Sequence, residues 1–318
     1  MWVARLELEN FRNHRSTALE LSPGRSVFVG PNGHGKTNLI EGIGFLAYQS
    51  SHRVAQTSTL IGAGHKEAAI RLTLRHDGRS ADLACVLRDP GANRAKVNGK
   101  QVALGELSRW LKVVVFSPED LHLVRGEPQG RRRYLDSTLV AMSPGAATTL
   151  SDYDRVVRQR NTFLKTHRGA RSPRAEDTLE GWNESLITLG AEITRRRRDT
   201  IERLRPHLAS LYSTISGGDG ASIELESPVV EVASDQGALE SAYRVLMDQR
   251  RADEWERGVT LVGPHRDDLI LSVNGLPSRT HSSQGEAWSM ALSLRMAQAR
   301  IYREESQAGD PVVILDDV

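Results

Sequence analysis

The chain has 318 residues, of which 39% are hydrophobic and 26% charged, and its formal net charge is +2. This suits a soluble globular protein with room for two domains. The absence of any run of 18 apolar residues excludes a membrane-spanning helix. Acids and Arg near the N-terminus exclude a signal peptide. The single cysteine, Cys85, allows no intrachain disulfide, so we expect a cytoplasmic protein.

The first 116 residues carry mostly strand patterns. Residues 2–9 alternate between apolar and polar, a turn follows at 10–14, and the apolar run 26–29 predicts a short buried strand. Asn98-Gly99 is a strong hairpin signal within a region that we expect to be antiparallel. The further strands expected here are 19–21, 69–74, 81–87, 95–97, a short one at 102, and 113–116.

Residues 30–37 read Gly-Pro-Asn-Gly-His-Gly-Lys-Thr and match the phosphate-binding pattern G-x-x-x-x-G-K-[ST]. A strand, a glycine loop and a helix in this order surround one anion with backbone N–H groups and a helix N-terminus. We expect Lys36 to reach the β- and γ-phosphates and Thr37 to hold Mg²⁺. The expected ATP-binding residues are Gly30, Pro31, Asn32, Gly33, His34, Gly35, Lys36, Thr37 and Asn38.

The pattern changes to charged helices between residues 117 and 258. Strand character returns at 259–262 and 269–273, before an amphipathic helix at 287–302. The helices expected between them are 131–142, 148–166, 178–203 and 236–257, with an extended insertion at 221–232.

Residues 311–317 form an apolar run that ends in two acids, Asp316 and Asp317. A nucleotide–Mg²⁺ site needs a carboxylate at the end of a strand that lies beside the phosphate-binding loop. We therefore expect Asp316 to hold the metal and Asp317 to polarise a water against the γ-phosphate. Alone, the same pattern also fits an ordinary strand followed by a solvated acidic turn.

These patterns predict an α/β fold in which one nucleotide-binding unit is encoded in two pieces. The pieces are residues 1–116 and 259–318, and a helical module of residues 117–258 interrupts them. This organisation is typical of ABC-type ATPase heads, in which a mixed sheet accompanies an antiparallel β lobe.

The segment His281-Ser-Ser-Gln-Gly-Glu286 precedes the helix at 287–302. Its hydroxyls, N–H groups and helix dipole suit a γ-phosphate, and we expect Ser283 and Gly285 to contact ATP. Such a turn is too far from its own phosphate-binding loop, which implies a head-to-head dimer with ATP between two copies. The alternative is a plain capping box, since Ser283 and Glu286 have the required spacing, and both interpretations can hold at once.

Basic residues concentrate between Arg125 and Arg174, a segment that contains eleven Arg and Lys but only four Asp and Glu. Such a surface suits sequence-independent contacts to DNA phosphates. The alternative for each arginine is a solvated, salt-bridged helix face. The candidate DNA contacts are Arg131, Arg132, Arg133, Arg155 and Arg158, followed by Arg160, Lys165, Arg168 and Arg171. We expect no zinc site, because the histidines lack partners at metal spacing.

Several motifs in order resemble the RecF family of bacterial recombination proteins, and the resemblance runs along the whole chain. They begin with Leu8-Glu-Asn-Phe-Arg-Asn-His14 and the loop at 30–38. The later ones are Phe116-Ser-Pro-Glu-Asp-Leu121, Arg131-Arg-Arg-Tyr-Leu-Asp136, Leu261-Val-Gly-Pro-His-Arg-Asp-Asp-Leu269, Ser283-Gln-Gly-Glu286 and Leu315-Asp-Asp-Val318.

The resemblance implies an SMC-like ATPase head with a short helical arm, ATP-dependent dimerisation on gapped DNA and slow ATP hydrolysis. It implies recombinational repair at stalled replication forks, the SOS response, and RecO and RecR as partners in loading RecA. By the same resemblance Arg12 contacts ATP phosphates, and Asn13 and His14 lie near the nucleotide.

Two features depart from the family pattern. Glu286 stands where related ATPases commonly carry Gln. The family also continues past its Asp-Asp motif, so we expect a head that ends at Val318 to be C-terminally truncated and impaired in hydrolysis. Two alternatives remain at this stage: a nucleotide-gated scaffold without significant hydrolysis, and a transporter-type ABC ATPase subunit.

Overall fold

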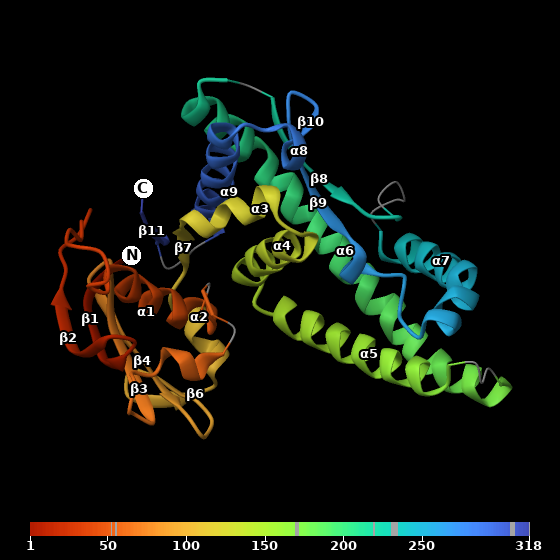
Figure 1. Cartoon of the computed structure of the whole chain (residues 1–318), viewed down its shortest axis with the longest axis horizontal. Helices are drawn as coiled ribbons and strands as arrows, with labels where there is room; N and C mark the ends of the chain where they lie inside the picture. Colours follow the sequence, from red (N-terminus) through yellow and green to blue (C-terminus); the bar gives the residue numbers. More distant parts are fainter. Residues whose placement is uncertain are drawn as a thin grey trace. The chain divides into compact units, whose positions relative to one another are not determined.

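The computed structural model describes residues 1–51, 53–54, 56–168, 172–218, 220–229, 235–305 and 309–317. They form two compact units (Figure 1). Unit 1 comprises Met1–Asp120 and Leu294–Val318, and unit 2 comprises Leu121–Ser293. No helix among the described residues combines the length and apolar character needed to cross a membrane.

Unit 1 contains a six-stranded antiparallel sheet in the order β2-β1-β3-β4-β5-β6. The Asn98-Gly99 turn joins β5 to β6 with positive φ angles of 49° and 78°, as a tight hairpin requires. This confirms the predicted antiparallel lobe. The strands are β1 (Trp2–Phe11), β2 (His14–Glu20), β3 (Glu67–His76), β4 (Arg79–Arg88), β5 (Arg94–Val97) and β6 (Lys100–Val102).

Helix α1 (Lys36–Tyr48) packs on this sheet through a shared apolar core. Ile43 and Leu46 from the helix join Leu6, Leu8 and Phe11 from β1, and all are at most 5% exposed. The short elements η1 (Thr57–Leu60), η2 (Leu104–Glu106) and α2 (Leu107–Trp110) complete this layer. Burial against the sheet therefore fixes the helix whose N-terminus carries the glycine loop.

A two-stranded parallel sheet joins the two chain segments that make up unit 1. Strand β7 (Val113–Phe116) pairs with β11 (Val312–Leu315), with Val113 opposite Val312 and Phe116 opposite Leu315. Arg295 from α9 (Gln284–Glu305) adds an ion pair to Asp120 at 2.6 Å, at the end of η3 (Pro118–Asp120). Strand β11, which leads to Asp316, is thus fixed beside β7, the strand that follows the antiparallel lobe.

The predicted strand at 26–29 is wrong. These residues have no strand conformation, and Val27 and Val29 are 82% and 90% exposed. A short apolar run becomes a strand only where a neighbouring strand supplies hydrogen bonds, and no described ladder reaches it. The predicted strand at 259–262 is also absent, because these residues lead into η4 (Pro264–Arg266).

The described part of unit 2 is helical apart from the antiparallel sheet β10-β9-β8 and the connecting loops. Its longest helix, α6, runs through Pro206, although proline usually ends a helix. Leu204 and Leu208 stay fully buried on either side of the proline, so packing maintains the helix where the sequence predicted its end. The elements are α3 (Leu121–Arg125), α4 (Pro128–Met142), α5 (Ala146–Thr166), α6 (Pro173–Ser216), β8 (Ala221–Glu226), α7 (Gln236–Arg257), β9 (Asp268–Val273), β10 (Leu276–Pro277) and α8 (Ser278–His281).

The strands and helices of unit 1 and the helices of unit 2 agree with the predicted α/β fold interrupted by a helical module. The first unit boundary, at Asp120, lies near the predicted one at 116. Residues 259–293 group with unit 2, because β9 pairs with β8. The assignment of 1–116 with 259–318 as a functional head, and of 117–258 as an arm, stays a prediction.

Candidate nucleotide-binding site

The glycine-rich loop enters α1 through a left-handed residue. Gly35 is the N-cap of the helix, with φ 92°, and Gly33 has φ 82°. A Cβ atom on Gly35 would lie 2.6 Å from Oδ1 of Asn13 and 2.7 Å from Nε2 of His14. Glycine is therefore required here by both backbone conformation and space.

Lys36 bends back over the loop that precedes it. Its Nζ donates to the carbonyl oxygen of Gly30 at 2.7 Å and to that of Pro31 at 3.0 Å. The Lys36 side chain thus reaches from the start of α1 back to the first residues of the loop. A positive charge held across a glycine loop suits a phosphate that the loop surrounds.

Thr37 and Asp316 meet although 279 residues separate them in the sequence. The Thr37 hydroxyl donates to Oδ1 of Asp316 at 3.3 Å. The Asp316 backbone N–H donates to the Phe116 carbonyl at 2.9 Å, which extends the β7–β11 ladder by one bond. One hydroxyl and one carboxylate oxygen therefore lie side by side at the helix N-terminus. Asp317 follows, exposed and with φ 50°.

The turn between β1 and β2 packs against the glycine loop. Asn13 Nδ2 donates to the Gly33 carbonyl at 3.4 Å, and His14 Nε2 lies 3.1 Å from the Gly35 carbonyl oxygen. Asn38 on α1 donates to Oδ1 of Asn13 at 2.8 Å. The structure thus brings Asn13, His14 and Asn38 together around the loop.

Arg12, in the same turn, forms a bidentate ion pair with Glu41 of α1, at 2.9 Å from Nε and 2.7 Å from Nη2. Glu41 was not recognised as a candidate from the sequence, because a glutamate one turn into a helix is normally a solvated residue. Only the structure shows that Glu41 is not solvated, since the residue is 0% exposed.

Ser283 and Glu286 form the predicted capping box at the start of α9. Ser283 donates its backbone N–H and its hydroxyl to Oε2 of Glu286, both at 2.8 Å, and the Glu286 N–H returns a bond of 3.3 Å. These bonds lower the pKa of Glu286. Ser283 and Gly285 are exposed and lie in unit 2. Their contact with ATP stays a prediction.

The candidate DNA contacts fall into two groups. Arg131 is 4% exposed and pairs with Asp268 at 2.7 and 2.6 Å, and the half-buried Arg132 donates to the Asp267 carbonyl at 2.6 Å. Arg160 is likewise buried, against Glu254 at 2.5 Å. All three connect elements within unit 2. For Arg131 and Arg160 we correct the assignment, because buried, paired guanidinium groups are not free for phosphates. Arg132 is partly exposed, so its contact with DNA stays a prediction.

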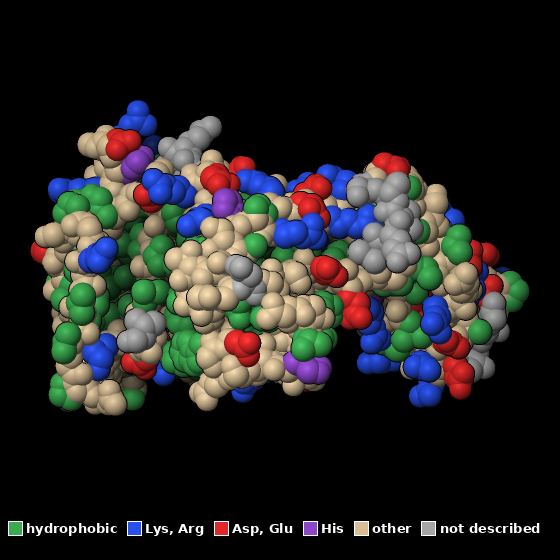
Figure 2. Space-filling model, turned by 90° about the horizontal axis from the view of Figure 1, so that it is seen from above, with side chains coloured by type: hydrophobic (Ala, Val, Ile, Leu, Met, Phe, Trp, Pro, Cys, Tyr) green, Lys and Arg blue, Asp and Glu red, His purple; other side chains and the backbone are tan. Residues whose placement is uncertain are grey.

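The second group is exposed: Arg133, Arg155 and Arg158, with Lys165 and Arg168 further along. Arg155 pairs with Asp152 at 2.8 Å and Arg168 donates to the Glu256 carbonyl at 2.7 Å. Arg171 lies outside the described residues. Figure 2 shows Lys and Arg intermixed with Asp and Glu on the face that it draws, as the low net charge suggests.

Two residues of the motif at 261–269, His265 and Arg266, have structural contacts within unit 2. His265 Nδ1 lies 2.7 Å from the Tyr153 hydroxyl, and Arg266 donates to the Thr260 carbonyl at 3.1 Å. Burial lowers the pKa of His265 to about 4. The ring is therefore neutral near pH 7 and offers no cation to DNA.

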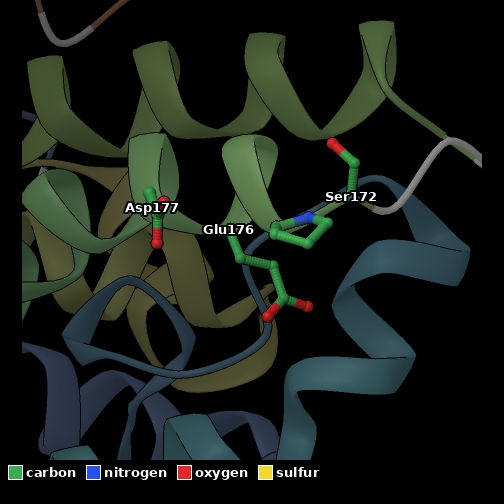
Figure 3. A pocket seen from close by; sticks show the side chains of 4 residues that line it. Ser172, Glu176 and Asp177 are labelled. Atoms are coloured by element: carbon green, nitrogen blue, oxygen red, sulfur yellow. The ribbon is translucent and has the colours of Figure 1, made fainter.

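One open pocket lies at the N-terminus of α6, lined by Ser172, Pro173, Glu176 and Asp177 (Figure 3). None of the predicted nucleotide-binding residues lines it. Its two carboxylates would repel a triphosphate, so the nucleotide site is better sought at the glycine loop.

Gly35→Ala is expected to lower ATP affinity at least about tenfold. The added methyl group would displace Asn13 and His14, and a left-handed alanine is strained by about 1–2 kcal/mol. Titration with a fluorescent ATP analogue measures this. Gly64→Ala is the control, since Gly64 also has positive φ, 82°, but open space around it. Equal affinities for the Gly35 variant and wild type would contradict the tight packing.

Comparison with known proteins identifies the family. The family model described as the RecF/RecN/SMC N terminal domain matches residues 2–318. The whole chain aligns at 43% identity with the DNA replication and repair protein RecF of Clavibacter sepedonicus, covering 83% of that protein. The chain belongs to the RecF family. The corresponding protein of Leifsonia xyli is 41% identical, with 86% of its length covered.

Solved structures agree with this family assignment. A structure of the recombination mediator protein RecF-ATP in the RecFOR pathway matches with a TM-score of 0.92 and 28% identity, covering all of this chain and 85% of that one. The Smc head domain of Pyrococcus furiosus shares the fold at a TM-score of 0.50 and 15% identity. Membership of the RecF family, whose members are DNA replication and repair proteins, supports the main functional prediction over the transporter-type alternative.

Proposed function

We propose that the chain binds ATP at the glycine loop of unit 1 and acts as an ATP-dependent DNA-binding protein in recombinational repair. The observation that carries the proposal is the contact between Thr37 and Asp316, 3.3 Å apart beside the loop. A phosphate-binding loop with a carboxylate at the end of a neighbouring strand is the arrangement used for nucleotide–metal binding. The RecF-ATP structure that this chain resembles supports ATP as the nucleotide.

The donor set suits Mg²⁺, which prefers oxygen ligands and is commonly held by one or two carboxylates together with substrate phosphates. Thr37 and Asp316 would hold the ion. When bound, Mg²⁺ would supply positive charge against the phosphates. The chain's own part is to surround the phosphates with the N–H groups of residues 32–37, to add the charges of Lys36 and Arg12, and to orient a water through Asp317.

The proposal includes an ATP-dependent homodimer in which Ser283 and Gly285 of one copy contact the nucleotide of the other. Exposure of both residues at the N-terminus of α9 supports this, since a helix N-terminus favours an anion. Glu286, held by Ser283, keeps a negative charge at the same turn. This charge favours, as a second candidate, a nucleotide-gated scaffold with little hydrolysis.

DNA is proposed to bind through phosphate contacts by the exposed Arg133, Arg155 and Arg158. RecO and RecR are the proposed partners in loading RecA on gapped DNA, in line with the RecFOR pathway of the similar structure. Sedimentation with and without ATP and gapped DNA tests the function as a whole. A monomer that binds neither ligand would refute it.

Replacing Arg155 and Arg158 by Ala is expected to weaken DNA binding and to reduce the slope of log affinity against log salt by about two units. Each lost phosphate contact removes about 0.9 from this slope. The matched control replaces Arg244 and Arg250, two exposed arginines of α7 in the same unit. If both double variants give the same slope as wild type, the DNA site lies elsewhere.

A further inference from the structure

Glu41 is a fully buried carboxylate beside the glycine loop, with four polar groups directed at it. It accepts from Arg12 Nε at 2.9 Å and Nη2 at 2.7 Å, and from the Ser51 hydroxyl. The Arg53 guanidinium lies 3.5 Å away. Burying a charge is costly unless it is paired and hydrogen-bonded. This residue is therefore built into the site, although none of the predicted roles uses it.

The ion pair orders an arginine that precedes two residues in contact with the glycine loop. The next two residues, Asn13 and His14, contact the carbonyls of Gly33 and Gly35. Arg12 also donates from Nη1 to the Thr59 carbonyl at 3.2 Å. A guanidinium has five N–H donors. Among the described contacts three are used, one on each nitrogen, so Nη1 and Nη2 each keep a second hydrogen for another anion.

Glu41 is charged at neutral pH. Burial raises its pKa, but the hydrogen bonds from Arg12 and Ser51, with the charges of Arg12 and Arg53, outweigh burial and leave the pKa below its usual value. A charged partner fixes the arginine more firmly than a neutral one, since charge-assisted hydrogen bonds are about twice as strong.

We propose that Glu41 is a positioning residue for nucleotide binding, which holds the Arg12 guanidinium ready for the triphosphate bound by residues 30–37. The inference rests on the function proposed above, in which Arg12 contacts the phosphates. An arginine ordered before binding loses less side-chain entropy when the nucleotide arrives. Glu41 thus acts on ATP only through Arg12.

Glu41→Asp tests this, because the variant keeps the charge but is one methylene shorter and cannot maintain both bonds to Arg12. We expect about tenfold weaker binding of a fluorescent ATP analogue with Mg²⁺. In an Arg12→Ala background, Glu41→Asp should change the affinity no further, so the two effects are strongly coupled. The matched control is Glu67→Asp in the same unit, where Glu67 pairs with Arg88 at 2.8 Å. It should bind as wild type.

A purely structural role gives different results. Glu41→Asp would then lower the unfolding temperature but leave ATP affinity unchanged, or weaken binding equally with and without Arg12, and either result overturns the inference. Wild type and Lys36→Ala are measured alongside. If wild type binds no ATP, the proposed function itself fails. If wild type binds, Lys36→Ala does not, and Glu41→Asp matches wild type, only the role of Glu41 fails.

Discussion

Replacing Lys36 by Ala is expected to lower ATP affinity by about 100-fold. The lysine supplies a charge-assisted bond to the phosphates, of a kind worth about 1.5–3 kcal/mol, and a factor of ten in affinity corresponds to about 1.4 kcal/mol. It also ties the loop together through the Gly30 and Pro31 carbonyls. Both losses act in the same direction. Calorimetric titration with ATP and Mg²⁺ measures the affinity.

The control for Lys36→Ala is Lys100→Ala, which removes one exposed lysine from β6 in the same unit. This variant should bind ATP as wild type does. Thermal unfolding of both variants without nucleotide shows whether the fold survives. Tight ATP binding by a folded Lys36→Ala protein would refute the assignment of residues 30–37 as the phosphate-binding loop.

Ser283→Arg is expected to abolish ATP-dependent dimerisation and to leave ATP binding by the single chain nearly unchanged. In the proposed dimer, the serine hydroxyl and the N–H groups of its turn approach the nucleotide of the other copy. A long side chain at this position blocks that approach sterically. The nucleotide residues of unit 1 are untouched, so binding and dimerisation should separate. Light scattering with and without ATP measures the dimer.

Ser283→Arg also breaks the capping box with Glu286, which costs about 0.5–2 kcal/mol. Ser172→Arg controls for this loss, because Ser172 caps α6 in the same unit by accepting from the Ala175 N–H at 3.3 Å. It should lose a helix cap yet dimerise normally. A Ser283→Arg protein that still forms the ATP-dependent dimer would contradict the proposed interface.

The sequence predicted the elements whose signals are local. The antiparallel lobe follows from alternating strands and the Asn98-Gly99 turn, and α7 begins and ends at the expected residues, Gln236 and Arg257. The glycine loop could be predicted because the fixed spacing of Gly, Lys and Thr is a pattern for phosphate binding. Its partner, Asp316, was expected at the end of a strand beside the loop. Strand β11 pairs with β7, and the Thr37–Asp316 contact brings the end of β11 to the loop.

The failed predictions concern features that depend on tertiary neighbours. Residues 26–29 have the composition of a buried strand, but strand formation needs a paired neighbour. Arg131 belongs to a basic run, yet its side chain is turned to Asp268, 137 residues away in sequence. Likewise the proposed role of Glu41 depends on the β1–β2 turn, which brings Arg12 against it. Charge counts and spacing contain no information about such pairs.

The central claim is that the two ends of the chain form one nucleotide–metal site. The most direct test is a crystal structure with ATP and Mn²⁺, in which anomalous scattering locates the cation. The account predicts one cation bound by the Thr37 hydroxyl, the Asp316 carboxylate and the phosphates over residues 30–37. A nucleotide bound elsewhere, or a cation that contacts neither Thr37 nor Asp316, would contradict it.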